Sequence, residues 1–476
     1  MKTLLSTLCL LLGAYAHTQP ADLAIRGAII VDVTDGSIIY DQTVLIEGNR
    51  IVAIGTTDAV RVPDEAEVLE AAGGYLIPGL WDAHVHSAGS VGWHFRLYVA
   101  HGITSVRNMH SGAENPLELV LSIKRRVRTG ELLGPRFLAN GSIVDGDPPV
   151  WPGSVAVRNA AAASAVVDRL ADDGADFIKV YDRLTSEAYF AILKRAKQRG
   201  IPVDGHLPFL IRPEEAAAAG QRTFEHASGI TMGCASGADA LRADYVRYLE
   251  RVPEMAPYPD QMVEFFRLVR RAINARDPEL CRQAARSFHE YGVATVPTLV
   301  ANAGSDPQGF VADAERMDLL PHSVREEWRA IAEGPDLIGE LLGPVNALIV
   351  ENVRVLHDEG AVILAGTDVG NPFLVPGLSL HRELERLTEA GLSPLEALQA
   401  ATLLPARVFG LEDSLGTVAV GKLADLVLLE ANPLEAIANT RRIRAVVTNG
   451  RLFRRADLDR LLAEAEELNQ QIEKQE

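Results

Sequence analysis

The amino-acid sequence predicts an α/β protein, a (β/α)8 barrel joined to a small β-sandwich domain that both chain ends build. Two observations carry this prediction. In the middle of the chain, short apolar strands alternate with Ala/Leu/Arg-rich helical stretches, which is the pattern of parallel strands with crossover helices. Toward both ends, short runs that alternate apolar and polar positions are separated by turn residues, which is typical of antiparallel strands.

The composition is that of a globular protein. The chain has 476 residues, of which 47% are hydrophobic and 23% are charged, so more than one structural unit is expected. The formal net charge of −18 argues against nucleic acid or an anionic membrane as a partner, because phosphates would be repelled. We expect a small-molecule substrate, as set out below, and a homo-oligomer is compatible with the sequence.

Residues 1–19 are typical of an export signal. A positively charged start is followed by an apolar run over 4–12 and by the small-residue site AYA at 14–16. The run is too short for a permanent membrane span, and a buried N-terminal element is the alternative. We therefore expect an exported protein, periplasmic or secreted. Cys234 and Cys281 would remain after cleavage, either as one disulfide or as two buried thiols.

Residues 20–77 and 410–455 are expected to form the small β-sandwich domain. "AIRGAIIVDV" and "TVLIEGNRIVAIG" supply strands from one chain end, and "LADLVLLE" and "IRAVVTNGRLF" supply strands from the other. Strand-rich segments at both ends of an α/β chain favour one domain built from the two. Residues 456–476 are expected to form a C-terminal amphipathic helix with a solvated face.

Residues 78–409 are expected to form the barrel. A doubly wound open sheet is the alternative, but no Gly-rich phosphate loop follows any candidate strand. Two long helical insertions, near 233–291 and 305–350, follow barrel strands and are expected to lie over the C-terminal face as a lid. The candidate strands end near His86, Asn108, Asn140, Tyr181, His206, His226, Thr298 and Thr367.

Metal-ligand residue types gather at these strand ends. His84 and His86 form an HxH pair on one face of the first strand, so both imidazoles can reach one cation. His206, His226 and Asp368 end later strands. Each alone is also compatible with a hydrogen-bonded core histidine or a helix-capping aspartate. Together they favour a metal site, because the carboxyl ends of barrel strands meet on one face.

Lys179 lies inside the apolar strand "DFIKVYD". A free ammonium there is costly and needs a partner. Carbamylation by CO2 would convert it into an anionic oxygen ligand able to bridge two cations, and a salt bridge to Asp368 is the alternative. Tyr181 shares the inward face of this strand, where it either hydrogen-bonds the substrate or packs in the wall.

The motifs "PGLWDAHVH", "FIKVYD", "GH" at 205–206, "EHASG" and "AGTDVG" resemble, in order, the metal-ligand strands of the amidohydrolase superfamily. The likeness is to the imidazolonepropionase-like branch with Xaa-Pro dipeptidases and metallo-carboxypeptidases. The tail "GLSPLEALQAATLLPARVFGLEDSLGTVAVGKLADLVLLEANPL" is similar to the superfamily's end. The resemblance implies two divalent cations, for which zinc fits best. By this resemblance, one cation would be bound by His84, His86 and Asp368 and the other by His206 and His226. Carbamylated Lys179 would lie between the two cations.

The activity that the resemblance implies is hydrolysis of an amide or peptide C–N bond, in a dipeptide, an acyl-amino acid or a similar molecule. A hydroxide shared by the metals would attack the carbonyl, and Asp368 would carry its proton to the departing amine. A cyclic amide, lactone, ester or organophosphate is the alternative substrate for the same site. A catalytically inactive binding protein is the alternative of another class, although such a protein is expected to have lost ligands.

The sequence departs from the dipeptidase-like pattern near the expected substrate. The loop "GSIVDGDPPVWPG" holds no histidine where such members carry Gly-Gly-His, and the small Gly205 precedes His206. Arg107 and Asn108 end the second strand, where they would contact a substrate carboxylate or form salt bridges at the barrel mouth. Seven histidines lack ligand spacing and are expected to be structural, with His110 the best exception: His94, His101, His110, His289, His322, His357 and His381.

Overall fold

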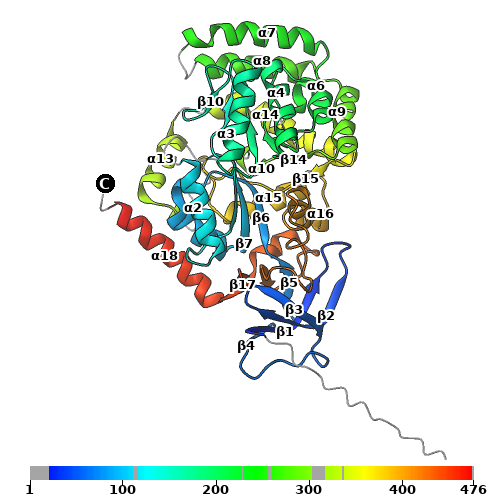
Figure 1. Cartoon of the computed structure of the whole chain (residues 1–476), viewed down its shortest axis with the longest axis vertical. Coiled ribbons are helices and arrows are strands. Elements are labelled where there is room, and N and C mark those ends of the chain that lie inside the picture. Colours follow the sequence, from blue (N-terminus) through cyan, green and yellow to red (C-terminus); the bar gives the residue numbers. More distant parts are fainter. Residues whose placement is uncertain are drawn as a thin grey trace, which may run out of the picture.

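The computed structural model describes residues 21–110, 116–227, 229–255, 260–302, 317–334 and 337–473. Their strands form three sheets, of eight, seven and three strands. The eight-stranded sheet lies at one end of the molecule, and helices α7 (Ala238–Arg251) and α8 (Met262–Asn274) lie at the other (Figure 1). The predicted export signal lies outside the described residues.

The eight-stranded sheet is built from both ends of the chain. Strand β16 (Leu426–Leu429) pairs antiparallel with β5 (Tyr75–Pro78), so that Leu428 lies opposite Leu76. The strand order is β18-β17-β16-β5-β1-β2-β3, with β4 paired to β1. The other strands are β1 (Leu23–Val31), β2 (Ile38–Glu47), β3 (Arg50–Thr56), β4 (Glu67–Glu70), β17 (Ile443–Thr448) and β18 (Arg451–Arg454).

The strands at the centre of this sheet are buried on both faces. Leu76 and Leu428 belong to the apolar core of the small domain, whereas Ile77 and Val427 pack into the core of the barrel region. Successive residues of β5 and β16 therefore pack alternately into the core of the small domain and into the core of the barrel region. Two stacked sheets were expected here, and one continuous sheet that encloses its own core is found. The alternation of apolar and polar residues along a strand identifies the buried side chains, but it does not determine whether the strands form one sheet or two.

The eight predicted barrel strands are present, and all pair in parallel. Three form the sheet β6 (Leu80–Val85), β7 (Ile103–Asn108) and β8 (Arg136–Ala139). The seven-stranded sheet has the order β10-β9-β11-β12-β13-β14-β15. Its members are β9 (Val144–Asp145), β10 (Val155–Ala156), β11 (Ile178–Val180), β12 (Val203–Gly205), β13 (Thr223–Glu225), β14 (Ala294–Val296) and β15 (Val362–Ile363).

Backbone hydrogen bonds join the two parallel sheets on both sides. On one side, the amide of Ala83 donates to the carbonyl of Ala365 at 2.9 Å, and the amide of Asp368 donates to the carbonyl of His84 at 2.7 Å. On the other side, the amide of Asp176 donates to the carbonyl of Ala139 at 2.8 Å. The segment after β15 therefore runs beside β6, which brings Asp368 next to the first-strand histidines.

Helices follow the strands in the alternating order that the sequence predicted. Of the two insertions, the first holds α7 and α8 and leads into α9, and the second lies partly in 303–316 and 335–336, outside the described residues. None of the described helices is both long and apolar enough to cross a membrane.

The barrel helices are α1 (Val91–Ala100), α2 (Leu117–Arg128), α3 (Ala160–Asp172), α4 (Ser186–Arg199), α5 (Pro213–Ala219), α9 (Pro278–Tyr291), α14 (Leu337–Asp358), α15 (Leu378–Glu389), α16 (Pro394–Ala400) and α17 (Leu403–Val408). The remaining helices are α6 (Ile230–Gly233), α10 (Leu299–Asn302), α13 (His322–Glu333) and α18 (Arg455–Glu473).

A disulfide and an ion pair fix two of these helices. Cys234 and Cys281, which the sequence left as thiols or a disulfide, form a disulfide that ties the end of α6 to α9. The C-terminal helix α18 packs along α1, and Arg96 Nε lies 3.0 Å from a carboxylate oxygen of Glu464. The start of the first insertion and the C-terminal helix are therefore both held to the barrel region.

Candidate metal centre

All six predicted ligands lie at the carboxyl ends of parallel strands. A cavity of about 380 Å³ opens there, and five of the six line it, while His84 does not line it and is fully buried. His84 belongs to β6 and Lys179 to β11, and the other four follow their strands within a few residues. The five lining residues are His86, Lys179, His206, His226 and Asp368.

Asp368 is the centre of the buried side of this cluster. Its Oδ1 lies 2.9 Å from Nε2 of His86 and 3.2 Å from Nε2 of His84, and its Oδ2 lies 3.9 Å from Nδ1 of His226. Ligand atoms of His84, His226 and Asp368 all lie within 4.8 Å of one another. Burial opposes ionisation of Asp368, but His84 and His226 outweigh it, so the pKa of this carboxyl lies well below its usual value.

The outward ring nitrogens of two histidines are held by carboxylates. Nδ1 of His84 lies 2.7 Å from Oε2 of Glu225, and Nδ1 of His206 lies 2.9 Å from Oδ1 of Asp182. The opposite nitrogens, Nε2 of His84 and of His206, are buried and form no hydrogen bond with the part of the chain that the structure describes. Orphaned imidazole nitrogens backed by carboxylates are the arrangement of metal-binding histidines, so the residues fit divalent cations.

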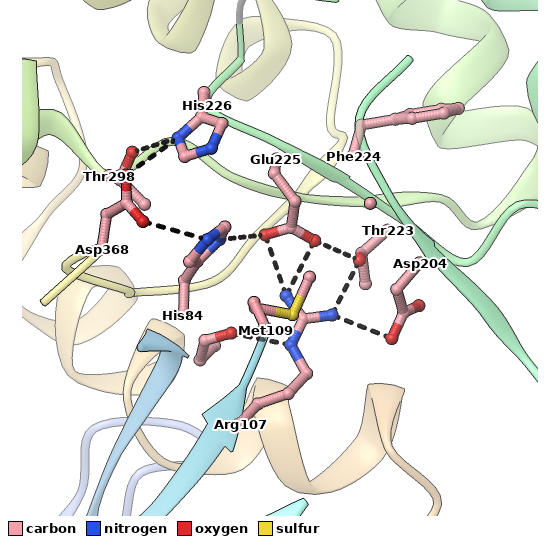
Figure 2. A network of polar contacts seen from close by, with 12 residues as sticks. His84, Arg107, Met109, Asp204, Thr223, Phe224, Glu225, His226, Thr298 and Asp368 are labelled. Atoms are coloured by element: carbon pink, nitrogen blue, oxygen red, sulfur yellow. Dashed lines mark hydrogen bonds and ion pairs between the residues drawn. The ribbon is translucent and has the colours of Figure 1, made fainter. Parts of the chain in front are cut away.

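Arg107 supports this arrangement from below (Figure 2). It donates from Nη2 to Oε1 of Glu225 at 2.8 Å and from Nη1 to Oδ2 of Asp204 at 2.9 Å, and all three side chains are buried. Its Nε donates to the carbonyl of Ala83 on β6 at 2.7 Å. The sequence placed Arg107 at the barrel mouth. It lies instead inside the barrel region, where its charge stabilises two buried carboxylates.

Lys179 has no hydrogen-bond or ion-pair partner among the described residues, although its Nζ lies 5.6 Å from the ring centroid of Tyr181. Its side chain is 2% exposed. The salt bridge to Asp368 that the sequence left open is therefore not formed. Burial lowers the pKa of Lys179 to about 8, which increases the neutral amine, the form that reacts with CO2.

An aromatic wall completes the cavity. The ring of Tyr181 packs against that of His206 with 3.9 Å between centroids, and Nε1 of Trp151 donates to the Tyr181 hydroxyl at 2.7 Å. His110, the exception among the histidines taken as structural, also lines the cavity, with its ring centroid 6.3 Å from that of His86. Burial, then the charges of Lys179 and His86, lower the pKa of His110 to about 4, so its imidazole is neutral.

Three residues at these strand ends have backbone conformations that are rare without glycine. His226 and Asp368 have φ of 64°, and Thr298 has φ of 49°. Such conformations are costly for residues with a Cβ and cluster at functional sites. The backbone is thus bent at the points where His226 and Asp368 turn toward the cavity, and Oγ1 of Thr298 lies 2.7 Å from Nδ1 of His226.

The sequence did not single out the residues that orient the histidines. Glu225 stands directly before His226, and Asp182 follows Tyr181, so both were inside quoted motifs without an assigned role. Asp82 is also buried, and its carboxylate accepts hydrogen bonds from the amide and hydroxyl of Thr367 at 2.9 and 2.6 Å. The signal in the sequence was an acidic residue inside an apolar strand. Because a buried carboxylate requires a partner, such a residue could have been predicted to bind a neighbouring polar side chain.

Comparisons with known proteins agree with the family that the motifs resemble. The family model described as "Amidohydrolase family" matches residues 345–453. Adenine deaminase 3 of Rhizobium meliloti is 22% identical over 425 residues, covering 88% of this chain and 57% of that protein. An imidazolonepropionase of Rubrobacter xylanophilus is 31% identical over 227 residues, covering 44% of this chain and 52% of that protein. The chain spans about half the length of the curated relatives it matches.

Solved structures share the fold over nearly the whole chain. Bottromycin amidohydrolase has a TM-score of 0.69 at 25% identity, covering 94% of this chain and 90% of that one. A Xaa-Pro dipeptidase with bound methionine has a TM-score of 0.65 at 21% identity, covering 91% of this chain and 99% of that one. Together with the family match over residues 345–453, these likenesses support the amidohydrolase superfamily, as the motifs predicted.

Proposed function

We propose that the protein is a two-metal hydrolase that cleaves an amide or peptide C–N bond of a small molecule. One observation carries the proposal: the carboxylate-backed His84 and His206, whose Nε2 atoms form no hydrogen bond with the described residues, gather with Asp368 at one group of strand ends. His84, His86 and Asp368 would hold one cation, and His206 and His226 the other. Lys179, as its carbamate, would lie between them. Divalent cations there, most suitably zinc, would supply Lewis acidity and a nucleophile at neutral pH.

Two side chains of the site perform the proton chemistry in this proposal. Asp368 is held ionised by its histidine neighbours, so it can accept a proton from the attacking water. It would return that proton to the departing amine as the C–N bond breaks. The Tyr181 hydroxyl accepts from Trp151, which leaves its own hydrogen free to donate to the carbonyl oxygen as negative charge develops there.

A cyclic C–N substrate is the second candidate. The curated relatives are named adenine deaminases and imidazolonepropionase, which favours a ring substrate on the same set of residues. A hydrolysis panel separates the candidates: acyl-amino acids, dipeptides, cyclic amides and esters, each assayed with protein loaded to a measured metal content. We expect turnover of at least one amide class and loss of turnover after chelation. A fully loaded protein that turns over none of these would refute the proposal.

We further propose that the protein is exported, to the periplasm or outside the cell. Two features support this: the N-terminal segment with its charged start, apolar run and small-residue site, and the disulfide between Cys234 and Cys281, which persists in oxidising compartments. Intact-mass measurement of protein made with its own N-terminus tests the proposal. Loss of about the first 16 to 19 residues from exported protein is expected, and a full-length intracellular product would contradict it.

A further inference from the structure

The loop between β9 and β10 presents a tryptophan to the cavity. Trp151 is 49% exposed, the largest exposed fraction among the four tryptophans of the chain. It lines the cavity beside Ile143 and Tyr181. This is the loop in which the sequence lacks the histidine of the dipeptidase-like pattern.

Trp151 is held in place rather than loosely exposed. Its Nε1 is satisfied by the Tyr181 hydroxyl, which leaves the two faces of the indole without a polar group to bond. The loop that carries it is anchored by Asp145, whose buried carboxylate accepts from the amides of Gly146 at 2.8 Å and Val150 at 2.9 Å. Arg183 donates to the carbonyl of Pro148 at 3.1 Å from the other side. The indole is therefore positioned before any ligand arrives.

We propose that Trp151 binds a planar apolar group of the substrate, so that the preferred substrates are amides with an aromatic or similarly flat ring next to the scissile bond. The inference rests on the proposed amide hydrolysis. An exposed indole beside an apolar side chain gains from covering its face, and aromatic rings add stacking energy to that burial. Because the Trp151–Tyr181–His206 wall runs from the mouth to the metal ligands, a ring on Trp151 would place its attached carbonyl near the cations.

The test compares selectivity rather than activity. Benzoyl and acetyl amides of the same amine are assayed with the metal-loaded wild type and with Trp151→Ala, Trp151→Phe and Val150→Ala. Val150 is the matched control, since it is an exposed apolar residue of the same loop that does not line the cavity. We expect the benzoyl-to-acetyl ratio of kcat/KM to fall by at least about fivefold in Trp151→Ala and to be mostly retained in the other two variants.

A binding measurement separates this inference from the proposed activity. Benzohydroxamate and acetohydroxamate are bound to the metal-loaded proteins, and their affinities are measured by isothermal titration calorimetry. Tighter benzohydroxamate binding that disappears in Trp151→Ala supports the subsite even if no amide in the panel is hydrolysed. Equal losses on both amides, with an unchanged ratio of hydroxamate affinities, would show that Trp151 only supports the wall and would overturn the inference.

Discussion

Glu225 Oε2 lies 2.7 Å from Nδ1 of His84, and both side chains are fully buried. When the Nδ1–H group of His84 donates a hydrogen bond to the carboxylate, Nε2 carries no proton. The lone pair of Nε2 is then available to a metal on the side of Asp368. Burial opposes ionisation of Glu225, but the Arg107 charge and the His84 hydrogen bond outweigh it, so the pKa of Glu225 lies far below its ordinary value. The first-strand histidine is thus oriented by residues of two other strands.

Replacing this carboxylate should weaken metal binding. In Glu225→Gln the glutamine NH2 group replaces one carboxylate oxygen and cannot accept a hydrogen bond. Either Arg107 or His84 therefore loses its acceptor, and the imidazole of His84 is less firmly held. Loss of such a partner typically costs about 10- to 100-fold in metal affinity. Competition with a chromophoric chelator measures the zinc affinity, and we expect a decrease of that size for at least one of the bound ions.

Folding must be separated from this effect, because the variant leaves the buried charge of Arg107 partly unpaired. Thermal unfolding of the chelated variant reports the loss of stability directly. The double variant Arg107→Met with Glu225→Gln removes the unpaired charge and should regain stability without regaining zinc affinity. Glu430→Gln, an exposed surface change, is the control. Zinc affinity equal to wild type in Glu225→Gln would mean that Glu225 only neutralises Arg107.

The positions of the site residues could be predicted because each ends a short apolar run with a polar side chain. His206 and His226 followed strands that were predicted within a residue or two of β12 and β13. Parallel strands meet at one edge, so strand ends that are far apart in sequence become neighbours in space. The alternation of β5 and β16 likewise predicted which chain segments share the small domain.

The partners of Arg107 could not be predicted in the same way. Its contacts with Asp204 and Glu225 depend on the register and tilt of strands about 100 residues apart in the chain, which no local pattern encodes. The sequence suggested ion pairing for Arg107 but could not say whether it would occur at the mouth or in the interior. The role of Trp151 was hidden for a similar reason, since loop conformation decides where its ring points.

Lys179→Ala tests the bridging role. Alanine leaves a gap between the two histidine pairs, so we expect loss of most activity and of one or both cations. Short carboxylic acids such as formate and acetate should restore part of the activity, because an added carboxylate can occupy the gap. Metal analysis and rate titration with the acids measure both effects. A variant with full activity and full metal content would show that Lys179 is a packing residue.

The buried carboxyl group of Glu383 should make the free energy of unfolding depend on pH. It lies in α15, and its carboxyl oxygens accept from the amides of Leu299 at 3.0 Å and Val300 at 2.7 Å. Burial raises the pKa of Glu383 from 4.5 to about 8. Between these values the folded protein keeps a proton that the unfolded chain releases, so this group lowers the free energy of unfolding as pH rises.

Urea unfolding from pH 5 to pH 8 measures that effect. The wild type should lose stability relative to Glu383→Gln as the pH rises through this window, because glutamine does not titrate. Glu389→Gln on the same helix is the control, since Glu389 is 47% exposed and should leave the pH dependence unchanged. Parallel stability curves for wild type and Glu383→Gln would show that Glu383 is ionised in the folded protein.

Asp368→Asn is the sharpest test of the proposed mechanism. Asparagine keeps the shape and one coordinating oxygen next to His84 and His86, so the metal content should decrease only modestly. It cannot carry a proton from the attacking water to the amine. General acid–base catalysis typically contributes about 10²- to 10⁴-fold, so kcat for amides should fall at least that far.

The leaving group separates the two roles of Asp368. An amine must be protonated to depart, whereas an activated aryl ester releases a phenolate that needs no proton. The amide rate of Asp368→Asn should therefore fall more than its ester rate, each taken relative to the wild type at equal metal content. Equal losses on the two substrates would mean that Asp368 acts chiefly as a ligand and that another group, such as the neutral His110 imidazole at the same cavity, carries the proton.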